Sequence, residues 1–155
     1  MRTISKRTKY ALQAVITLAR KYGEGPVPIA VLAKEDDIPV KFLELILLDL
    51  KNGQMLDSKK GPRGGYLLSR PPEKITVGSV IRLLEGPLAP LPCASENAFR
   101  PCEECRDVAN CGTRMVMRDV RDAIAEILDR TTLRDIVQRV QAGKTKTEEA
   151  LMYYI

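Results

Sequence analysis

The helical spacing of apolar residues in the first fifty positions constrains the fold of this chain more than any other feature. Alanine, leucine and valine recur with that spacing over residues 6–22, and a shorter stretch follows at residues 29–33. Pro39 then opens a third apolar stripe as a first-turn proline, and Gly53 ends that stripe. Two helices joined by about four residues, the second with charged residues on its outer side, predict a helix-turn-helix.

A glycine-rich basic turn follows the third predicted helix. It reads GPRGG and lies between two short strand-like segments at residues 55–60 and 66–68. Lys59, Lys60 and Arg63 lie at this turn, and its glycines would let the backbone approach a phosphate chain closely. We therefore predict a wing beside the helix-turn-helix, with a plain β-hairpin as the alternative. The pattern does not fit a Walker loop, because no Gly-Lys-Ser/Thr sequence opens a helix here.

Charge and composition narrow the class of protein. Residues 1–70 hold 13 Lys or Arg against 7 Asp or Glu, whereas residues 71–155 hold 12 against 13. This asymmetry predicts a polyanion partner for the first half, with a solvated basic surface as the alternative. The chain has no histidine, so no Ser-His-Asp triad or His-ligated zinc can form, and we expect a protein that is not an enzyme.

No segment of the sequence is suited to cross a membrane. The longest uncharged runs, residues 10–19 and 86–95, have ten residues each, which is too short for a spanning helix. The start of the chain resembles a signal peptide only briefly, because Arg20 and Lys21 stand where a cleavage site would need small residues. We expect a cytoplasmic protein with no membrane partner.

The second half predicts a helix, a loop and a longer helix. Residues 77–84 suggest the fourth helix, and an amphipathic pattern of roughly 18 residues begins after Gly112. Its apolar face must be covered by its own domain or by the same helix of a second subunit, and its place after a long loop favours a homodimer. Thr132, with Asp135 three residues on, predicts the cap of a last helix. We therefore expect a mainly α fold divided into a winged helix-turn-helix DNA-binding domain (1–85), a cysteine-rich sensor loop (86–112), a dimerisation helix with a following short helix (113–142) and a tail (143–155).

The loop holds every cysteine of the chain. Cys93, Cys102, Cys105 and Cys111 are separated by eight, two and five residues. In a reducing cytosol, clustered thiols are more often metal ligands than disulfides, and thiolates suit zinc or an iron–sulfur cluster. Only Cys102 and Cys105 have the two-residue gap that is frequent in zinc sites. The spacing therefore favours an iron–sulfur cluster over zinc, and metal-free, redox-active thiols remain a third reading.

The order of these motifs resembles a known family. RTKYAL, PVPIAVLAKEDDIPVKFLELIL, GPRGGYLL and ITVGSVIRLLEGPL are followed by the cysteine loop and the long helix. This order, over about residues 1–140, resembles the IscR/NsrR/CymR (Rrf-two) family of bacterial winged-helix transcriptional regulators. The resemblance implies dimers whose long helices cross and whose winged helices bind palindromic DNA. It also implies, for several members, a [2Fe-2S] cluster in the cysteine loop that serves as the redox or iron–sulfur signal.

The resemblance carries over to the cysteines only in part. Cluster-binding members have three cysteines, which Cys105, Cys111 and, across an insertion, Cys93 match here. The fourth ligands known in the family are a histidine and an aspartate, and basic residues stand at both matching positions. Cys102 could replace them, which is our inference. Members resembling CymR hold no cluster and sense by binding a partner enzyme, so a cluster-free regulator is the alternative.

The predicted DNA contacts fall into three groups. The start of the third helix would face base edges in the major groove, where Glu44 could accept from a cytosine amino group. The wing would reach the minor groove or its phosphates, and the first helix would hold the DNA backbone. Phe42 has core packing as its alternative role, and Lys6 and Arg7 have simple solvation. The predicted contacts are Pro39, Val40, Lys41, Phe42 and Glu44 for bases, Lys59, Lys60 and Arg63 for the wing, and Lys6, Arg7 and Tyr10 for the backbone.

The position of the loop suggests how a signal would reach the DNA. A cluster bound between the fourth helix and the dimer helix would fix the angle between that helix and the winged domain, and its loss or oxidation would change the half-site spacing. A small iron–sulfur or thiol electron carrier is less favoured, because it gives no role to the basic first half.

Overall fold

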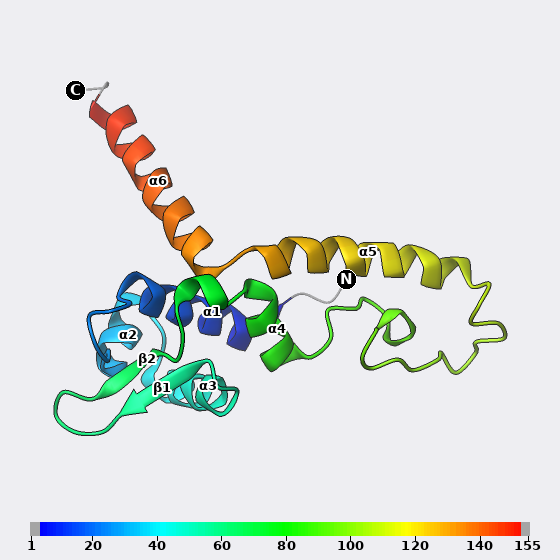
Figure 1. Cartoon of the computed structure of the whole chain (residues 1–155), viewed down its shortest axis with the longest axis horizontal. Coiled ribbons are helices and arrows are strands. Elements are labelled where there is room, and N and C mark those ends of the chain that lie inside the picture. The colour runs from blue at the N-terminus through cyan, green and yellow to red at the C-terminus, as the bar shows by residue number, and fades with distance from the viewer. Residues whose placement is uncertain (1–3, 153–155) are drawn as a thin grey trace.

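The computed structural model describes residues 4–152 of the chain, which form a helical body with two projecting helices (Figure 1). The two strands pair as one antiparallel hairpin, so the expected mainly α winged helix-turn-helix is confirmed. No described helix is long and apolar enough to span a bilayer. The elements are α1 (Lys6–Arg20), α2 (Ile29–Glu35), α3 (Val40–Asn52), β1 (Leu56–Lys59), β2 (Gly65–Leu68), the short turn η1 (Pro72–Lys74), α4 (Val77–Glu85), the short turn η2 (Pro92–Ala94), α5 (Gly112–Arg130) and α6 (Leu133–Met152).

The core lies where α1 packs against the helix-turn-helix and α4. α1 contributes a buried stripe that includes Ala14, Val15 and Leu18, and α3 faces it with buried leucine and isoleucine side chains. Each such side chain contributes roughly 1.5–3 kcal/mol when it leaves water, so this stripe largely sets how α3 is oriented. Leu133, the first residue of α6, is also fully buried in this core.

A segment before α2 pairs with β2 and attaches the wing to the rest of the domain. β1 and β2 pair from Leu56–Leu68 to Lys59–Gly65, and Val27 forms an isolated bridge with Tyr66. The bridge has N–O distances of 2.8 and 2.9 Å. Gly65 has a φ of +153°, and a Cβ there would collide with the Val27 carbonyl, so only glycine permits this close approach.

Three expectations about helix ends differ from the structure. α1 ends at Arg20 rather than near residue 22, and α3 begins at Val40, so Pro39 precedes the first turn as its N-cap. α6 continues to Met152, so the expected short helix and the tail at 143–155 are wrong for the described residues, and residues 153–155 lie outside them. The polar segment around residues 144–151 consists largely of good helix formers, which extend a helix that the predicted Thr132–Asp135 cap has started.

Candidate nucleic-acid interface and cysteine loop

The outer face of α3 is solvent-exposed at each residue expected to read bases. Leu43, Ile46, Leu47 and Leu50 point into the core, so the opposite side of the helix is free. β1 packs against α3, which places the hairpin beside this helix (Figure 1). The exposed residues of the predicted set are Pro39, Val40, Lys41, Phe42 and Glu44.

Phe42 is partly packed against α1 and partly exposed, and its contact with DNA stays a prediction. Its side chain is 40% exposed, and its ring packs edge-on against Tyr10 of α1 with centroids 5.7 Å apart. The Lys6 ammonium in turn lies 5.5 Å from the centroid of the Tyr10 ring. A cation above an aromatic face gains about 0.5–1 kcal/mol at an exposed site. This stack therefore fixes the start of α3 against α1 and holds a lysine near the same surface.

The side chain of Arg7 is paired with another residue of the protein. Its guanidinium forms an ion pair with Asp49 on α3, and both side chains stay more than one-third exposed. This pair ties α1 to the second half of α3 and uses the charge that was predicted to contact DNA. Contact of Arg7 with a DNA backbone stays a prediction.

The wing carries a cluster of free cations. Lys59, Lys60 and Arg63 are exposed, and within the described part of the chain none of them forms an ion pair. Lys51, at the end of α3, donates a 2.7 Å hydrogen bond to Ser58 of β1 and joins the hairpin to the helix. The outer face of α3 and the wing thus both present positive charge to solvent. This surface is suited to bind a polyanion.

The cysteine loop brings two of its four thiols together. Cys93 is buried in η2, Cys102 is exposed, and their Sγ atoms are 3.9 Å apart. The hydrogen bond with Cys93, followed by the charge of Cys93, raises the pKa of the Cys102 thiol. Cys105 and Cys111 are half-buried. Among residues 4–152, no three Cys, Asp or Glu side chains converge as a metal site would need.

This arrangement fits a metal centre only in part. Two thiolates bound to one tetrahedral metal at about 2.3 Å lie about 3.8 Å apart, so Cys93 and Cys102 have a suitable spacing. The same distance is also ordinary contact between two thiols. The donor chemistry suits a soft metal or an iron–sulfur cluster, whereas the four predicted ligands are not gathered around one point. Their assignment as ligands stays a prediction.

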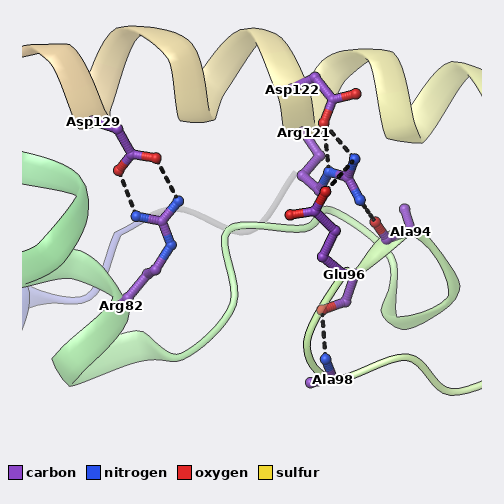
Figure 2. Close-up of polar contacts among 8 residues, drawn as sticks. Arg82, Ala94, Glu96, Ala98, Arg121, Asp122 and Asp129 are labelled. Carbon is purple, nitrogen blue, oxygen red and sulfur yellow. Dashed lines mark hydrogen bonds and ion pairs between the residues drawn. The ribbon is translucent and has the colours of Figure 1, made fainter.

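Two arginines of α5, Arg121 (Figure 2) and Arg114, hold the first part of the loop. Arg121 donates a 2.7 Å hydrogen bond to the Ala94 carbonyl, and its side chain is only 10% exposed. Asp122 accepts from the same guanidinium, and Glu96 forms a longer ion pair with it. About two turns further from the winged domain, Arg114 donates a 2.8 Å hydrogen bond to the Cys93 carbonyl. The backbone that carries Cys93 is therefore fixed to α5.

Polar contacts at α4 join it both to the long helix α5 and to the start of α1. Arg82 of α4 pairs with Asp129 of α5 through both guanidinium Nη atoms (Figure 2). Glu85, at the end of α4, accepts from the Thr8 hydroxyl at 2.6 Å and from the Ser5 amide at 3.0 Å. Glu85 thereby connects the start of the cysteine loop to the N-terminus of α1.

Sequence reasoning missed several of these residues. Arg121 has no local signal, because its role depends on a loop 27 residues away. The Arg82–Asp129 pair is equally non-local. Leu45, by contrast, lies four residues after Lys41, so plotting the third helix as a wheel would have placed it on the exposed face.

The fold and the site together define a transcriptional regulator with a winged helix-turn-helix and an attached long helix. The chain belongs to the Rrf2 family, described as iron-dependent transcriptional regulator, whose profile matches residues 4–139. It is 36% identical over 137 residues to an rrf2-like regulator of Rhodobacter capsulatus, covering 86% of this chain and 91% of that protein. CymR of Bacillus subtilis is 34% identical over 152 residues, covering 98% and 99%.

Solved structures agree with this assignment. The structure of CymR, described as the global cysteine regulator of B. subtilis, matches with a TM-score of 0.75 at 34% identity, covering 90% of this chain and 98% of that one. IscR of T. potens matches with a TM-score of 0.70 at 29% identity, covering 90% and 88%. The R. capsulatus and B. subtilis relatives are both named as transcriptional regulators, and the family is not one of enzymes.

Proposed function

We propose that this protein is a homodimeric regulator that binds a palindromic DNA operator and senses redox or iron–sulfur status through its cysteine loop. The observation that carries the DNA-binding part is the unpaired positive charge shared by the outer face of α3 and the wing. The operator lies in the bacterial cytoplasm, so the protein acts there.

The DNA contacts divide by chemistry. Lys41 and Glu44 on α3 would face base edges, where a lysine suits guanine and a glutamate suits the cytosine amino group. Lys59, Lys60 and Arg63 would bind phosphates, which fix register without reading sequence. Each phosphate contact releases counterions, so the affinity should fall steeply as salt rises.

A second copy of the chain would complete the molecule along α5. Met115, Val116 and Ile127 on this helix are each at least half exposed, and Arg121 is the one buried residue of the helix within the described chain. A 19-residue helix with an apolar face this exposed is suited to pack against its own symmetry mate. Two winged domains held in this way would present two recognition helices to two half-sites.

The loop would act on DNA binding through α5. Arg114 and Arg121 hold the Cys93 segment on this helix, and Arg82 holds α4 against Asp129. A change at the thiols would therefore alter how α5 meets the winged domain, and with it the separation of the half-sites. The cysteines would hold a [2Fe-2S] cluster, which when bound supplies a centre that responds to electrons and oxidants. The iron-dependent description of the family supports this reading.

A cluster-free regulator is the second candidate, with zinc, thiol oxidation or a partner protein as the signal. Two observations favour it: Cys93 and Cys102 alone are in contact, and the match to CymR extends over nearly the whole chain. Purification without oxygen separates the candidates. Visible absorbance with matching iron and sulfide content supports the cluster, whereas a colourless protein, with or without stoichiometric zinc, supports the second candidate.

The DNA-binding proposal is tested by selecting duplexes from a random library and measuring affinity by fluorescence anisotropy. We expect a selected inverted repeat, bound by two protomers with strong salt dependence. The variant K41A/K60A should lose specific binding. The matched control K144A/K146A removes two exposed lysines from α6 and should bind normally. Retained specific affinity in K41A/K60A would contradict the proposal.

A further inference from the structure

The outermost ridge of α3 carries two exposed leucines. Leu45 is 63% exposed and Leu48 is 50% exposed. They follow Lys41 by four and seven residues, so the three side chains lie along one line of the helix. This line is opposite the stripe that Leu43, Ile46, Leu47 and Leu50 bury in the core. Neither leucine belongs to the buried core of the domain.

The surroundings of the leucines indicate what covers them. An isolated exposed leucine is common on protein surfaces, but these two lie on the ridge that the proposed function turns toward DNA. Lys41 shares their ridge, Glu44 lies beside them, and the cationic wing is next to the helix. An apolar ridge surrounded by these charged groups is better suited to contact a polyanion than to contact the apolar patch of a second protein. The apolar face of α5, which is suited to a second copy, is a separate surface.

One chemical group in the major groove is complementary to leucine. Each thymine presents its C5-methyl there, whereas cytosine and adenine present amino donors and guanine presents acceptors. A leucine pressed against those polar groups would displace water without replacing its hydrogen bonds, which costs affinity. Against a thymine methyl the same leucine removes apolar surface from water on both sides.

We propose that Leu45, with Leu48 beside it, determines specificity by contacting the C5-methyl of thymine in each half-site. This inference rests on the proposed function and adds a residue role to it. Glu44 and Leu45 would then read neighbouring pairs by different chemistry, one through a hydrogen bond to cytosine and the other through apolar contact with thymine. The operator half-site should contain thymine at the position that faces the middle of α3.

The test replaces thymine by deoxyuridine, one position at a time, in the duplex that the full-length protein selects. This change removes the methyl group and leaves the base pairing intact. We expect at least one position in each half-site at which the dissociation constant of the wild type rises about threefold to fivefold, as the burial of one methyl predicts. Replacement outside the half-sites is the matched DNA control and should change nothing.

Variants at the ridge complete the test. L45A and L45Q should bind the thymine duplex more weakly than the wild type and should bind the thymine and deoxyuridine duplexes equally well. Both should fold, because the side chain is mostly exposed, and their circular dichroism should match the wild type. A selected half-site without thymine, or a wild type that ignores every replacement, would overturn the inference while leaving DNA binding intact. Failure to select any duplex would instead overturn the proposed function, and this inference with it.

Discussion

Arg82 on α4 meets Asp129 on α5 as a bidentate pair, with Nη2 and Oδ2 2.8 Å apart. Gly78 makes room for this contact, because a Cβ at that position would collide with the Asp129 carboxylate. The hydrogen bonds from Arg82 also lower the pKa of Asp129, so the carboxylate stays charged well below neutral pH. This contact joins the domain that would bind DNA to the helix that would form the dimer.

We predict that R82A mainly reduces the ability of the protein to discriminate between operators of different half-site spacing. It should lower the free energy of unfolding only slightly. The two side chains are 40% and 44% exposed, so the pair contributes at most about 1 kcal/mol to the free energy of unfolding. Its loss should let the winged domain turn against α5. The measurements are urea unfolding and affinity for duplexes whose half-sites are one base pair closer or further apart. The exchanged pair R82D/D129R should recover part of the discrimination, and unchanged discrimination in R82A would contradict the coupling route.

Arg121 should control access to Cys93. R121A removes the hydrogen bond to the Ala94 carbonyl, which should cost about 1.5–3 kcal/mol of stability and free the segment that buries this thiol. We expect Cys93 to react with iodoacetamide at least tenfold faster, measured by mass spectrometry of the digested protein. R118A removes an exposed arginine of the same helix and should label at the wild-type rate. Equal labelling of R121A and R118A would show that Arg121 does not hold the loop.

Gly65 should be required for the wing. In G65A the new Cβ would meet the Val27 carbonyl, so the bridge between Val27 and Tyr66 should open. We expect a loss of about 2–3 kcal/mol in urea unfolding, together with weaker DNA binding. G61A is the matched control: its φ of +107° also disfavours a side chain, but nothing lies within 4 Å of a Cβ there. G65A should therefore be clearly less stable than G61A, and equal stabilities would contradict the close approach.

Ionisation of Asp36 should lower the free energy of unfolding as the pH rises from about 4 toward neutral. Burial raises the pKa of this carboxyl above 3.8, partly offset by the hydrogen bond from Thr17, and its Oδ2 is buried with no hydrogen-bond partner among the described residues. The folded state therefore keeps the proton more readily than the unfolded state, so ionisation costs stability from pH 3.8 up through the raised pKa.

The variant D36N tests this direction of the pH dependence of stability. It retains an acceptor for Thr17 and cannot ionise, so its stability relative to the wild type should increase between pH 4 and pH 7, by about 1 kcal/mol or less. The measurement is urea unfolding of both proteins at the two pH values. A difference that is the same at both values, or that shrinks as the pH rises, would show that burial does not disfavour the charge.

Features set by local sequence were predictable. The helix-turn-helix follows from apolar spacing, the wing from glycines between two strand-like segments, and the Thr132–Asp135 cap from a three-residue interval; each depends on neighbours in the chain. The Arg121–Ala94 contact joins residues brought together only by tertiary packing. The spacing of the cysteines did not reveal that Cys93 and Cys102 would meet while Cys105 stays apart, because a loop without regular structure has no period to count.

Operator affinity in different states of the thiols tests most directly whether the cysteine loop governs the DNA-binding surface. One anaerobic preparation is titrated against the selected duplex as isolated, after removal of bound metal with a chelator, and after thiol oxidation. We predict that at least two of these states differ fivefold or more in dissociation constant, the lower range of coupling between two sites. The variant C93S/C102S/C105S/C111S should show one affinity throughout. Equal affinity of the wild type in every state would contradict the account.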